Sequence, residues 1–384
     1  MNFETLLKNQ EHLQTPCYYY DLELLRQTLD AMHRLTDMHE NWHVHYAMKA
    51  NADPIIMEEI RAAGLGIDAV SGGEISQALE AGFMPQSIVF AGVGKTDDEI
   101  RLALREKIAC LNVESVEELE VIEHIASEMG IKAPVALRIN PNIDAHTHKF
   151  ITTGLEENKF GINLSLLDST VDRVISSQWL QLCGLHFHIG SQITVARPFE
   201  ILSMTINKVV SNLEKRGVKI DMIDVGGGLG VDYYEPDLNP IPDFRTYFGA
   251  FSKYLKLPAH VQVHFELGRA IVAQCGALVS RVLYVKQGIS KKFAIIDGGF
   301  TELIRPALYG AHHRIENISA DNNDFETYDV VGPVCESTDV FDENAILPHT
   351  ERGHLLVLRT AGAYGEVMSM HYNGRSLKPT IYNI

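Results

Sequence analysis

The sequence predicts an α/β fold in which a TIM-like (β/α)8 barrel is followed by a mostly-β domain. Eight short strand-like runs alternate with helix-like segments over about 225 residues, as a closed barrel requires. After about Ala273, strand-like runs follow one another without long helices between them. The length of 384 residues also suits a barrel plus a second domain. A doubly wound sheet is the competing architecture, but even spacing without a clear switch point favours the barrel.

The predicted barrel begins with the run H-V-H-Y-A-M-K and ends with V-Q-V-H-F-E-L-G. Its eight strands, in chain order, are His43–Lys49, Ile67–Ser71, Ser87–Gly92, Ala109–Ser115, Val135–Asn140, Gly184–Ser191, Met222–Gly227 and Val261–Gly268. Between them, apolar residues recur at three- and four-residue spacing, as in Asp53–Ala63 and Val116–Met129, which predicts amphipathic helices. Asp53 followed by Pro54 is typical of an N-cap with a first-turn proline.

The change of pattern after the barrel predicts the domain boundaries. The later strand-like runs are Ala277–Lys286, Lys292–Ile296, Tyr328–Val331 and His354–Thr360. The N-terminal run Thr15–Tyr20 precedes the first barrel helix, and we expect it to pair with the β domain. The sequence therefore predicts a barrel at residues 25–273 and a β domain formed by residues 1–24 and 274–384.

Charge and cysteine content narrow the class of protein. The chain has 33 Lys and Arg against 50 Asp and Glu, a net charge of −17, which argues against nucleic acid or an anionic membrane as partner. Its five cysteines are scattered without a C-x-x-C pair, so a disulfide framework or zinc knuckle is not expected. With no signal-peptide pattern or membrane-length apolar run, we expect a cytoplasmic protein.

Reactive groups gather at the predicted strand ends, where barrels place their active sites. Four of the eight ends carry them: Lys49, His188 to Ser191, Asp224 to Gly228, and Glu266 to Arg269. Lys49 would be an ordinary surface lysine elsewhere, but at a barrel mouth desolvation favours the neutral amine that Schiff-base chemistry needs. The glycines after Val225 let backbone N–H groups approach a phosphate, although glycine triplets also occur in plain tight turns.

Glu266 is the most informative of these residues. It could form an ordinary ion pair, but with Lys49 and a phosphate loop it suits the ring nitrogen of pyridoxal phosphate. An anionic carboxylate keeps that nitrogen protonated, so the ring can accept electrons released at the substrate α-carbon. An arginine there would suit proton exchange better, so the residue type predicts decarboxylation. We expect His188 to lie flat against the cofactor and Ser191 to reach its phosphate or ring.

Three H-x-H pairs raise the alternative of a metal site, because alternation places both histidines on one face of a strand. They are His43/His45, His146/His148 and His186/His188. A metal-dependent barrel would need the first pair at the end of its strand, where this chain has Lys49. We therefore predict no metal.

Taken in order, Lys49, H-I-G-S, G-G-G and E-L-G-R resemble the pyridoxal-phosphate-dependent decarboxylases with an alanine-racemase-like barrel and a C-terminal β domain. The resemblance covers nearly the whole chain. Further motifs resemble the branch acting on meso-2,6-diaminopimelate: T-T-G with E-N-K-F-G (Thr152 to Gly161), I-R-P-A-L-Y (Ile304 to Tyr309), C-E-S (Cys335 to Ser337) and G-A-Y-G (Gly362 to Gly365). The chain departs from the family pattern at Leu267, where the family has proline, and at Thr338, where it has glycine.

The resemblance implies a role for each matching residue. Lys49 would be covalently linked to pyridoxal 5'-phosphate, and Cys335 would donate the proton that replaces CO2. The residues implied to hold the cofactor are Lys49, His188, Ser191, Gly227, Gly228, Glu266, Leu267, Gly268, Arg269 and Tyr364. Those implied to hold the substrate are Arg269, Arg305, Tyr309, Glu336 and Tyr364.

The expected reaction is decarboxylation of meso-2,6-diaminopimelate to L-lysine, by a homodimer with shared active sites. The charges agree, because the distal end of this substrate needs an arginine for its carboxylate and a carboxylate for its ammonium, and Arg305 and Glu336 supply them. A decarboxylase of ornithine, arginine or a carboxylated polyamine is the near alternative. A pyridoxal-phosphate-binding regulatory decoy is the non-enzymatic one, although decoys tend to lose the lysine or cysteine. Alanine racemase activity is disfavoured by Glu266.

Overall fold

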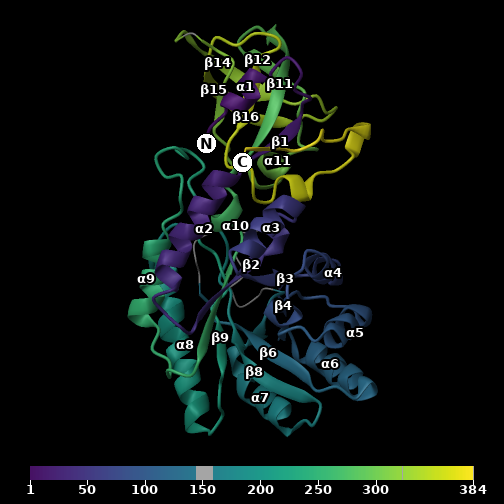
Figure 1. The fold of residues 1–384 in the computed structure, drawn as a ribbon, viewed down its shortest axis with the longest axis vertical. Coiled ribbons are helices and arrows are strands. Elements are labelled where there is room, and N and C mark those ends of the chain that lie inside the picture. The colour runs from purple at the N-terminus through teal and green to yellow at the C-terminus, as the bar shows by residue number, and fades with distance from the viewer. Residues whose placement is uncertain (144–158, 322, 384) are drawn as a thin grey trace. The chain divides into compact units, whose positions relative to one another are not determined.

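The computed structural model describes residues 1–143, 159–321 and 323–383, and the chain divides into two compact units (Figure 1). The barrel unit comprises Asp30–Gly230 and Asp243–Gly268, and the β unit comprises Met1–Leu29, Val231–Pro242 and Arg269–Ile384. The pair His146/His148 and the motif residues from Thr152 to Asn158 lie outside the described residues.

Eight parallel strands form the closed barrel that the sequence predicts. They are β2 (Trp42–Ala47), β3 (Gly66–Ala69), β4 (Ile88–Phe90), β5 (Cys110–Val113), β6 (Ala133–Asn140), β8 (Leu180–His186), β9 (Met222–Asp224) and β10 (Gln262–Leu267). Their order is β5-β4-β3-β2-β10-β9-β8-β6, and pairing of β5 with β6 closes the ring. A short strand, β7 (Ile162–Asn163), pairs with β6. Each of the eight predicted runs overlaps a barrel strand, although the boundaries differ by several residues for runs such as Gly184–Ser191.

Helices follow the strands, and several of them begin at a residue whose side chain caps the first turn. They are α3 (Pro54–Ala62), α4 (Gly72–Glu80), α5 (Asp97–Glu106), α6 (Val116–Met129), α7 (Leu167–Ser176), α8 (Arg197–Lys215) and α9 (Phe244–Tyr254). The Asp53 side chain accepts from two amides of the first turn of α3, as predicted, with Pro54 at the first helical position. Thr96 and Glu99 form a reciprocal capping box at α5. The helix α2 (Leu22–Thr36) contains the division between the two units.

Alternation along β10 separates an apolar outer face from a polar inner one. Phe265 packs against Trp42, Phe248 and Phe251. Its neighbours His264 and Glu266 belong to the opposite face of the strand, which lines the interior. A ring nitrogen of His264 lies 2.8 Å from one of His45. The interior of this barrel is therefore polar rather than filled with branched aliphatic side chains.

The β unit is built around one mixed sheet. Its strands are β1 (Cys17–Asp21), β11 (Gly276–Gln287), β12 (Lys292–Ile296), β13 (Ile315–Asn317), β14 (Phe325–Val331), β15 (Val340–Pro348), β16 (Leu355–Leu358) and β17 (Ile381–Asn383). β1 pairs antiparallel with β11, so the predicted pairing of the N-terminal run is confirmed. The sequence did not predict β13, β15 or β17. Short helices α1 (Glu4–Lys8), α10 (Arg269–Val272) and α11 (Arg305–Tyr309) complete the unit.

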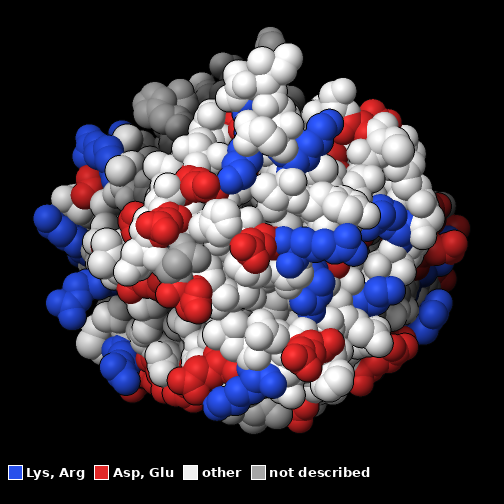
Figure 2. Space-filling view, turned by 90° about the horizontal axis from the view of Figure 1, so that it is seen from above, with Lys and Arg blue, Asp and Glu red and all other residues white. Residues whose placement is uncertain are grey.

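Surface charge and helix composition give two further observations. In the view of Figure 2, basic side chains stand beside acidic ones and do not gather into a broad basic field. None of the helices in the described part of the chain combines the length and apolar character needed to cross a bilayer.

The buried histidine pair predicts that acid destabilises the protein. Burial lowers the pKa of His45 to about 4 and that of His264 to about 2, so both are neutral in the fold. Because the unfolded chain binds these protons near pH 6.5, stability is complete above that pH and falls as the pH drops toward 4. We expect each histidine to contribute a loss of about 2 kcal/mol in unfolding free energy between pH 8 and pH 5.

Urea unfolding at the two pH values measures this loss. His264→Asn should reduce the difference by about 2 kcal/mol, because one of the two buried imidazoles is removed. An unchanged difference in that variant would exclude the histidine pair as the cause.

Candidate active site

Lys49, which the sequence predicts as the last residue of its strand, lies two residues beyond the end of that strand in the structure. β2 ends at Ala47, and Lys49 occupies a 3-10 turn, η1 (Met48–Ala50). The turn forms because the Asn51 amide bonds to the Met48 carbonyl, which ends the strand pairing. The predicted strand His43–Lys49 is therefore wrong at its last two residues. The side chain of Lys49 is 38% exposed, and its Nζ lies 3.1 Å from Oδ2 of Asp68.

Asp68 is a fully buried carboxyl group beside the amine. It lies on β3 and is 0% exposed. Burial and the negative charge of Glu266 raise the pKa of Asp68 to about 7, although Lys49 opposes the rise. At neutral pH this carboxyl group can therefore either hold a proton or accept one beside Lys49 Nζ.

Glu266 is held as a buried anion. It is 5% exposed on β10, and its Oε2 lies 3.2 Å from Nε2 of His186 on β8. Nδ2 of Asn112, on β5, donates to its Oε1 over 3.4 Å. Burial would raise the pKa of Glu266, but His186, Lys49 and His188 hold it below its ordinary value. This is the charge state that a protonated ring nitrogen requires.

Asp224, the last residue of β9, behaves in the opposite way. Burial and the charge of Glu266 raise its pKa well above the ordinary value. Its Oδ1 accepts from the Gly226 amide at 2.8 Å, while its Oδ2 is buried and no donor among the described residues reaches it. The raised pKa favours the protonated form of this carboxyl group.

His186, Asp224 and Glu266 also have the spacing of possible metal ligands. Nε2 of His186 and one carboxylate oxygen of each acid lie within 4.8 Å of one another. Metal ligation requires deprotonated carboxylates, which the raised pKa of Asp224 disfavours, and both oxygens of Glu266 already accept hydrogen bonds, from His186 and Asn112. The arrangement is better suited to an organic cofactor with a basic ring nitrogen.

The three glycines after β9 pack directly against neighbouring strand ends. Gly226 and Gly228 have φ of +69° and +109°, which favours glycine. A Cβ on Gly227 would come within 1.8 Å of the Glu266 carbonyl oxygen. The Glu266 amide in turn bonds to the Gly226 carbonyl at 2.9 Å. Strand pairing therefore fixes the glycine loop and the acid relative to each other.

Four more predicted cofactor residues belong to the same unit. Burial lowers the pKa of His188, and the Gly227 amide donates to its Nδ1 at 3.3 Å, so the neutral ring is held in one orientation. Leu267 is buried as the last residue of β10. Gly268 follows it, and a Cβ there would lie 3.0 Å from the Ala47 carbonyl, next to the turn that carries Lys49. Ser191 follows β8 within this unit.

In the β unit, the structure brings two predicted arginines to one tyrosine. Nη1 of Arg269 donates to the Tyr233 hydroxyl at 2.6 Å, and the Arg305 guanidinium lies 4.7 Å from the centre of the Tyr233 ring. Arg269 also lies 4.9 Å from the centre of the Tyr364 ring. Arg305 donates to Nε2 of His313 at 2.9 Å, and burial lowers the pKa of that imidazole to about 3, so it stays a neutral acceptor.

The remaining predicted residues lie at the surface of the β unit. Tyr309 is the last residue of α11. Cys335 and Glu336 are exposed. The Cys335 amide donates to Oδ1 of Asn373 at 3.2 Å, and the Tyr372 hydroxyl donates to Oε1 of Glu336 at 2.8 Å.

Sequence reasoning missed several members of these clusters. They are Asp68, Asn112, His186, Tyr233 and His313. Asp68 and Asn112 are polar residues inside otherwise apolar strand runs, and this signal could have identified them. His186 was noted only as half of an H-x-H pair. Nothing in the local sequence around Tyr233 or His313 indicates their contacts with the arginines.

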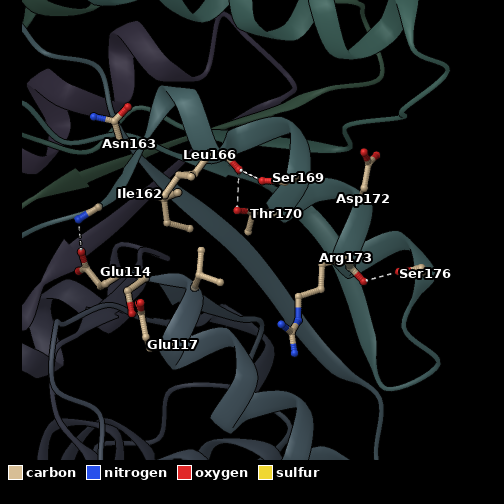
Figure 3. Close-up of a pocket in the computed structure, with 13 residues that line it drawn as sticks. Glu114, Glu117, Ile162, Asn163, Leu166, Ser169, Thr170, Asp172, Arg173 and Ser176 are labelled. Carbon is tan, nitrogen blue, oxygen red and sulfur yellow. Dashed lines mark hydrogen bonds between the residues drawn. The ribbon is translucent and has the colours of Figure 1, made fainter.

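One well-defined cavity of the barrel unit is lined by other residues. Its volume is about 910 Å³, and it is lined by α6, α7 and the turn η3 (Leu164–Leu166) (Figure 3). Glu114, at its edge, accepts from Nη1 of Arg138 at 2.6 Å and from the Gly161 amide at 3.0 Å. None of the predicted site residues lines this cavity.

The residues of the barrel unit fit pyridoxal phosphate. They provide an amine, a buried anionic carboxylate, a neutral imidazole held by a backbone amide, and a glycine loop without room for side chains. The fold and these residues define a pyridoxal-phosphate-dependent barrel enzyme. Residues 23–273 match the family described as "Pyridoxal-dependent decarboxylase, pyridoxal binding domain". The chain thus belongs to the pyridoxal-dependent decarboxylases.

Similarity to individual relatives shows to which branch of this family the chain belongs. The chain is 52% identical over 365 residues to a diaminopimelate decarboxylase of Bacteroides thetaiotaomicron, covering 95% of this chain and 94% of the relative. It resembles the crystal structure of the Helicobacter pylori diaminopimelate decarboxylase complexed with L-lysine, with a TM-score of 0.92, 38% identity and coverage of 100% and 94%. The M. jannaschii enzyme in complex with L-lysine gives a TM-score of 0.90, 32% identity and coverage of 98% and 89%. The chain is a member of the diaminopimelate decarboxylase family.

The close packing of the glycine loop yields a mutational prediction. Gly227→Ala places a methyl group against the Glu266 carbonyl, so the loop or β10 must move. We expect a loss of about 2 to 4 kcal/mol in unfolding free energy, together with weaker cofactor binding. Urea unfolding and titration with pyridoxal phosphate measure the two effects.

Gly249→Ala is the matched control. A Cβ on Gly249, within α9, meets nothing within 4 Å, so this substitution should be neutral or stabilise the helix by up to about 1 kcal/mol. Equal effects of the two substitutions would contradict the packing argument.

Proposed function

We propose that this chain catalyses the pyridoxal-phosphate-dependent decarboxylation of meso-2,6-diaminopimelate to L-lysine and CO2. The observation that carries the reaction type is the buried anionic Glu266, supported by His186 and Asn112 in the unit that also contains Lys49. The substrate assignment is supported by full-length similarity to diaminopimelate decarboxylases, including two solved with L-lysine bound.

The cofactor, when bound, accepts the electron pair that remains on the substrate α-carbon after CO2 leaves. We propose that Lys49 tethers it through Nζ, that His188 lies against its ring, and that Gly227 and Gly228 offer backbone amides to its phosphate. Ser191, Leu267, Gly268, Arg269 and Tyr364 complete the proposed set of cofactor residues. These assignments are supported by the motif order and by the loop packing.

Two carboxyl groups of the barrel unit have different proton-handling roles, Glu266 at the ring nitrogen of the cofactor and Asp68 at Lys49 Nζ. Glu266, kept anionic by its neighbours, retains a proton on the ring nitrogen. Asp68, whose pKa is raised to about 7 by burial and by Glu266, exchanges a proton with Lys49 Nζ when the amine is displaced by substrate. Neither role requires water in the barrel interior, because each proton acceptor is supplied by the chain.

The proposed substrate residues match a molecule with two carboxylates and two ammonium groups. Arg269 and Arg305 provide guanidinium groups, Glu336 provides a carboxylate, and Tyr309 and Tyr364 provide hydroxyls. Cys335 donates the proton that replaces CO2. The exposure of Cys335 and Glu336 supports their acting on substrate bound by a neighbouring protomer.

We therefore also propose a homodimer with shared active sites, working in the cytoplasm. We further propose that the functional domains are a cofactor-binding barrel at residues 25–273 and a β domain of residues 1–24 and 274–384. The family match over residues 23–273 supports this division.

A product assay tests the function. Purified protein with pyridoxal phosphate should release CO2 and L-lysine from meso-2,6-diaminopimelate, with no comparable turnover of ornithine or arginine. Lys49→Ala should lose the cofactor absorbance that borohydride bleaches and more than about 100-fold of the turnover, because the covalent tether is absent. Turnover of ornithine alone would refute the substrate assignment, and full activity of the variant would refute the role of Lys49.

Mixing two inactive variants tests the shared site. Lys49→Ala and Cys335→Ala protomers, dissociated and reassociated together, should regain about a quarter of wild-type activity, because half the dimers are mixed and each contains one intact site. Size-exclusion chromatography monitors the assembly. If mixed samples stay as inactive as the separate variants, Lys49 and Cys335 serve the same protomer.

A further inference from the structure

We propose that His186 and Asn112 are positioning residues, which fix the carboxylate of Glu266 so that it faces the ring nitrogen of the cofactor. The proposal rests on the proposed function, because it assigns residues that act through Glu266. Neither residue belongs to the motifs by which the family resemblance was drawn, and neither is expected to touch substrate.

The three side chains come from strands that are not neighbours in the barrel. β9 separates His186 on β8 from Glu266 on β10, and β2, β3 and β4 separate Asn112 on β5 from Glu266. All three residues are buried, with exposures of 1% for His186, 0% for Asn112 and 5% for Glu266. The Glu266 carboxylate therefore receives hydrogen bonds from two strands that lie on either side of β10 in the barrel.

Each donor engages a different oxygen of Glu266. Nε2 of His186 lies 3.2 Å from Oε2, and Nδ2 of Asn112 lies 3.4 Å from Oε1. A glutamate side chain has three rotatable bonds, and two donors on separate oxygens fix the orientation of its end group. Each oxygen can accept more than one hydrogen bond, so capacity remains for a ring N–H.

The surrounding charges explain why such support is needed. Burial disfavours the charged form of Glu266, and the carboxyl groups of Asp68 and Asp224 are electrostatically coupled to it. His186 is the strongest of the neighbours that hold the pKa of Glu266 down. Donation from Nε2 leaves Nδ1 of His186 buried, and no partner for it lies among the described residues. Within the described part of the chain, the His186 ring therefore makes one hydrogen bond, to Glu266.

Two cofactor analogues measure the effect without catalysis. One is 4'-deoxypyridoxine 5'-phosphate, which cannot react with Lys49, and the other is its 1-deaza counterpart, in which CH replaces the ring nitrogen. The ratio of their dissociation constants reports the contact between Glu266 and that nitrogen. Calorimetric titration of the full chain, freed of cofactor and checked by circular dichroism, gives both constants.

The wild-type protein should prefer the nitrogen-containing analogue by about tenfold or more, as expected for a charge-assisted hydrogen bond. His186→Leu should reduce the preference to less than about threefold, since the carboxylate loses its main donor. His186→Gln, which retains an N–H donor, should recover most of it.

His45→Gln is the matched control. His45 is another buried histidine of the barrel interior, but its ring nitrogen bonds to His264 rather than to Glu266. This variant should keep the preference, whatever stability it loses. An equal loss of preference in His45→Gln and His186→Leu would overturn the proposal, because the effect would then reflect general damage to the barrel.

The outcomes separate the proposal from the function on which it rests. A wild-type protein that does not distinguish the analogues would refute the contact between Glu266 and the ring nitrogen itself. A wild-type preference that persists in His186→Leu would refute only the positioning role. Should His186→Leu not fold, Asn112→Leu removes the other donor, and an unchanged preference in that variant would likewise overturn the proposal.

Discussion

A carboxylate inside a protein is stable only when nearby donors and positive charges replace the water that it has lost. Glu266 meets this condition through His186 and Asn112, and the barrel interior is organised around it. Its charge raises the pKa of Asp68 and of Asp224. Together with the burial of these two groups, which is the larger cause, the anion therefore favours the protonated form of both, and it brings the pKa of Asp68 to about 7 beside Lys49.

Backbone hydrogen bonds fix the position of Glu266. The Glu266 amide bonds to Gly226, and Gly227 packs against the Glu266 carbonyl with no room for a side chain. The loop that is proposed to hold the phosphate and the residue that is proposed to hold the ring nitrogen therefore share one set of contacts. The distance between these two proposed binding groups is therefore set by strand register and does not depend on flexible side chains.

Much of this architecture could be predicted from the sequence. The eight barrel runs are visible because strand-like segments alternate regularly with helices, and Glu266 and the glycine loop stand out as reactive groups at strand ends. β13 and β17 were missed because each has three residues and, unlike the equally short β4 and β9, lies outside the regular alternation of strands and helices. In the pairing of β14 with β15, register shifts interrupt the alternation that would have indicated β15. The contacts of His186, Tyr233 and His313 join residues distant in the chain, and local pattern does not report such contacts.

The route of the chain has a consequence for how the molecule is made. Tyr19 of β1 pairs with Ala277 of β11 and with Ile381 of β17, both far along the sequence. During synthesis, β1 therefore emerges before the barrel strands, whereas its partners β11 and β17 are made only after β10, the last of the barrel strands. Until then its buried tyrosines and its unpaired edges are open to other chains. The pairing of β1 with its sheet therefore cannot begin until the whole barrel sequence has been synthesised.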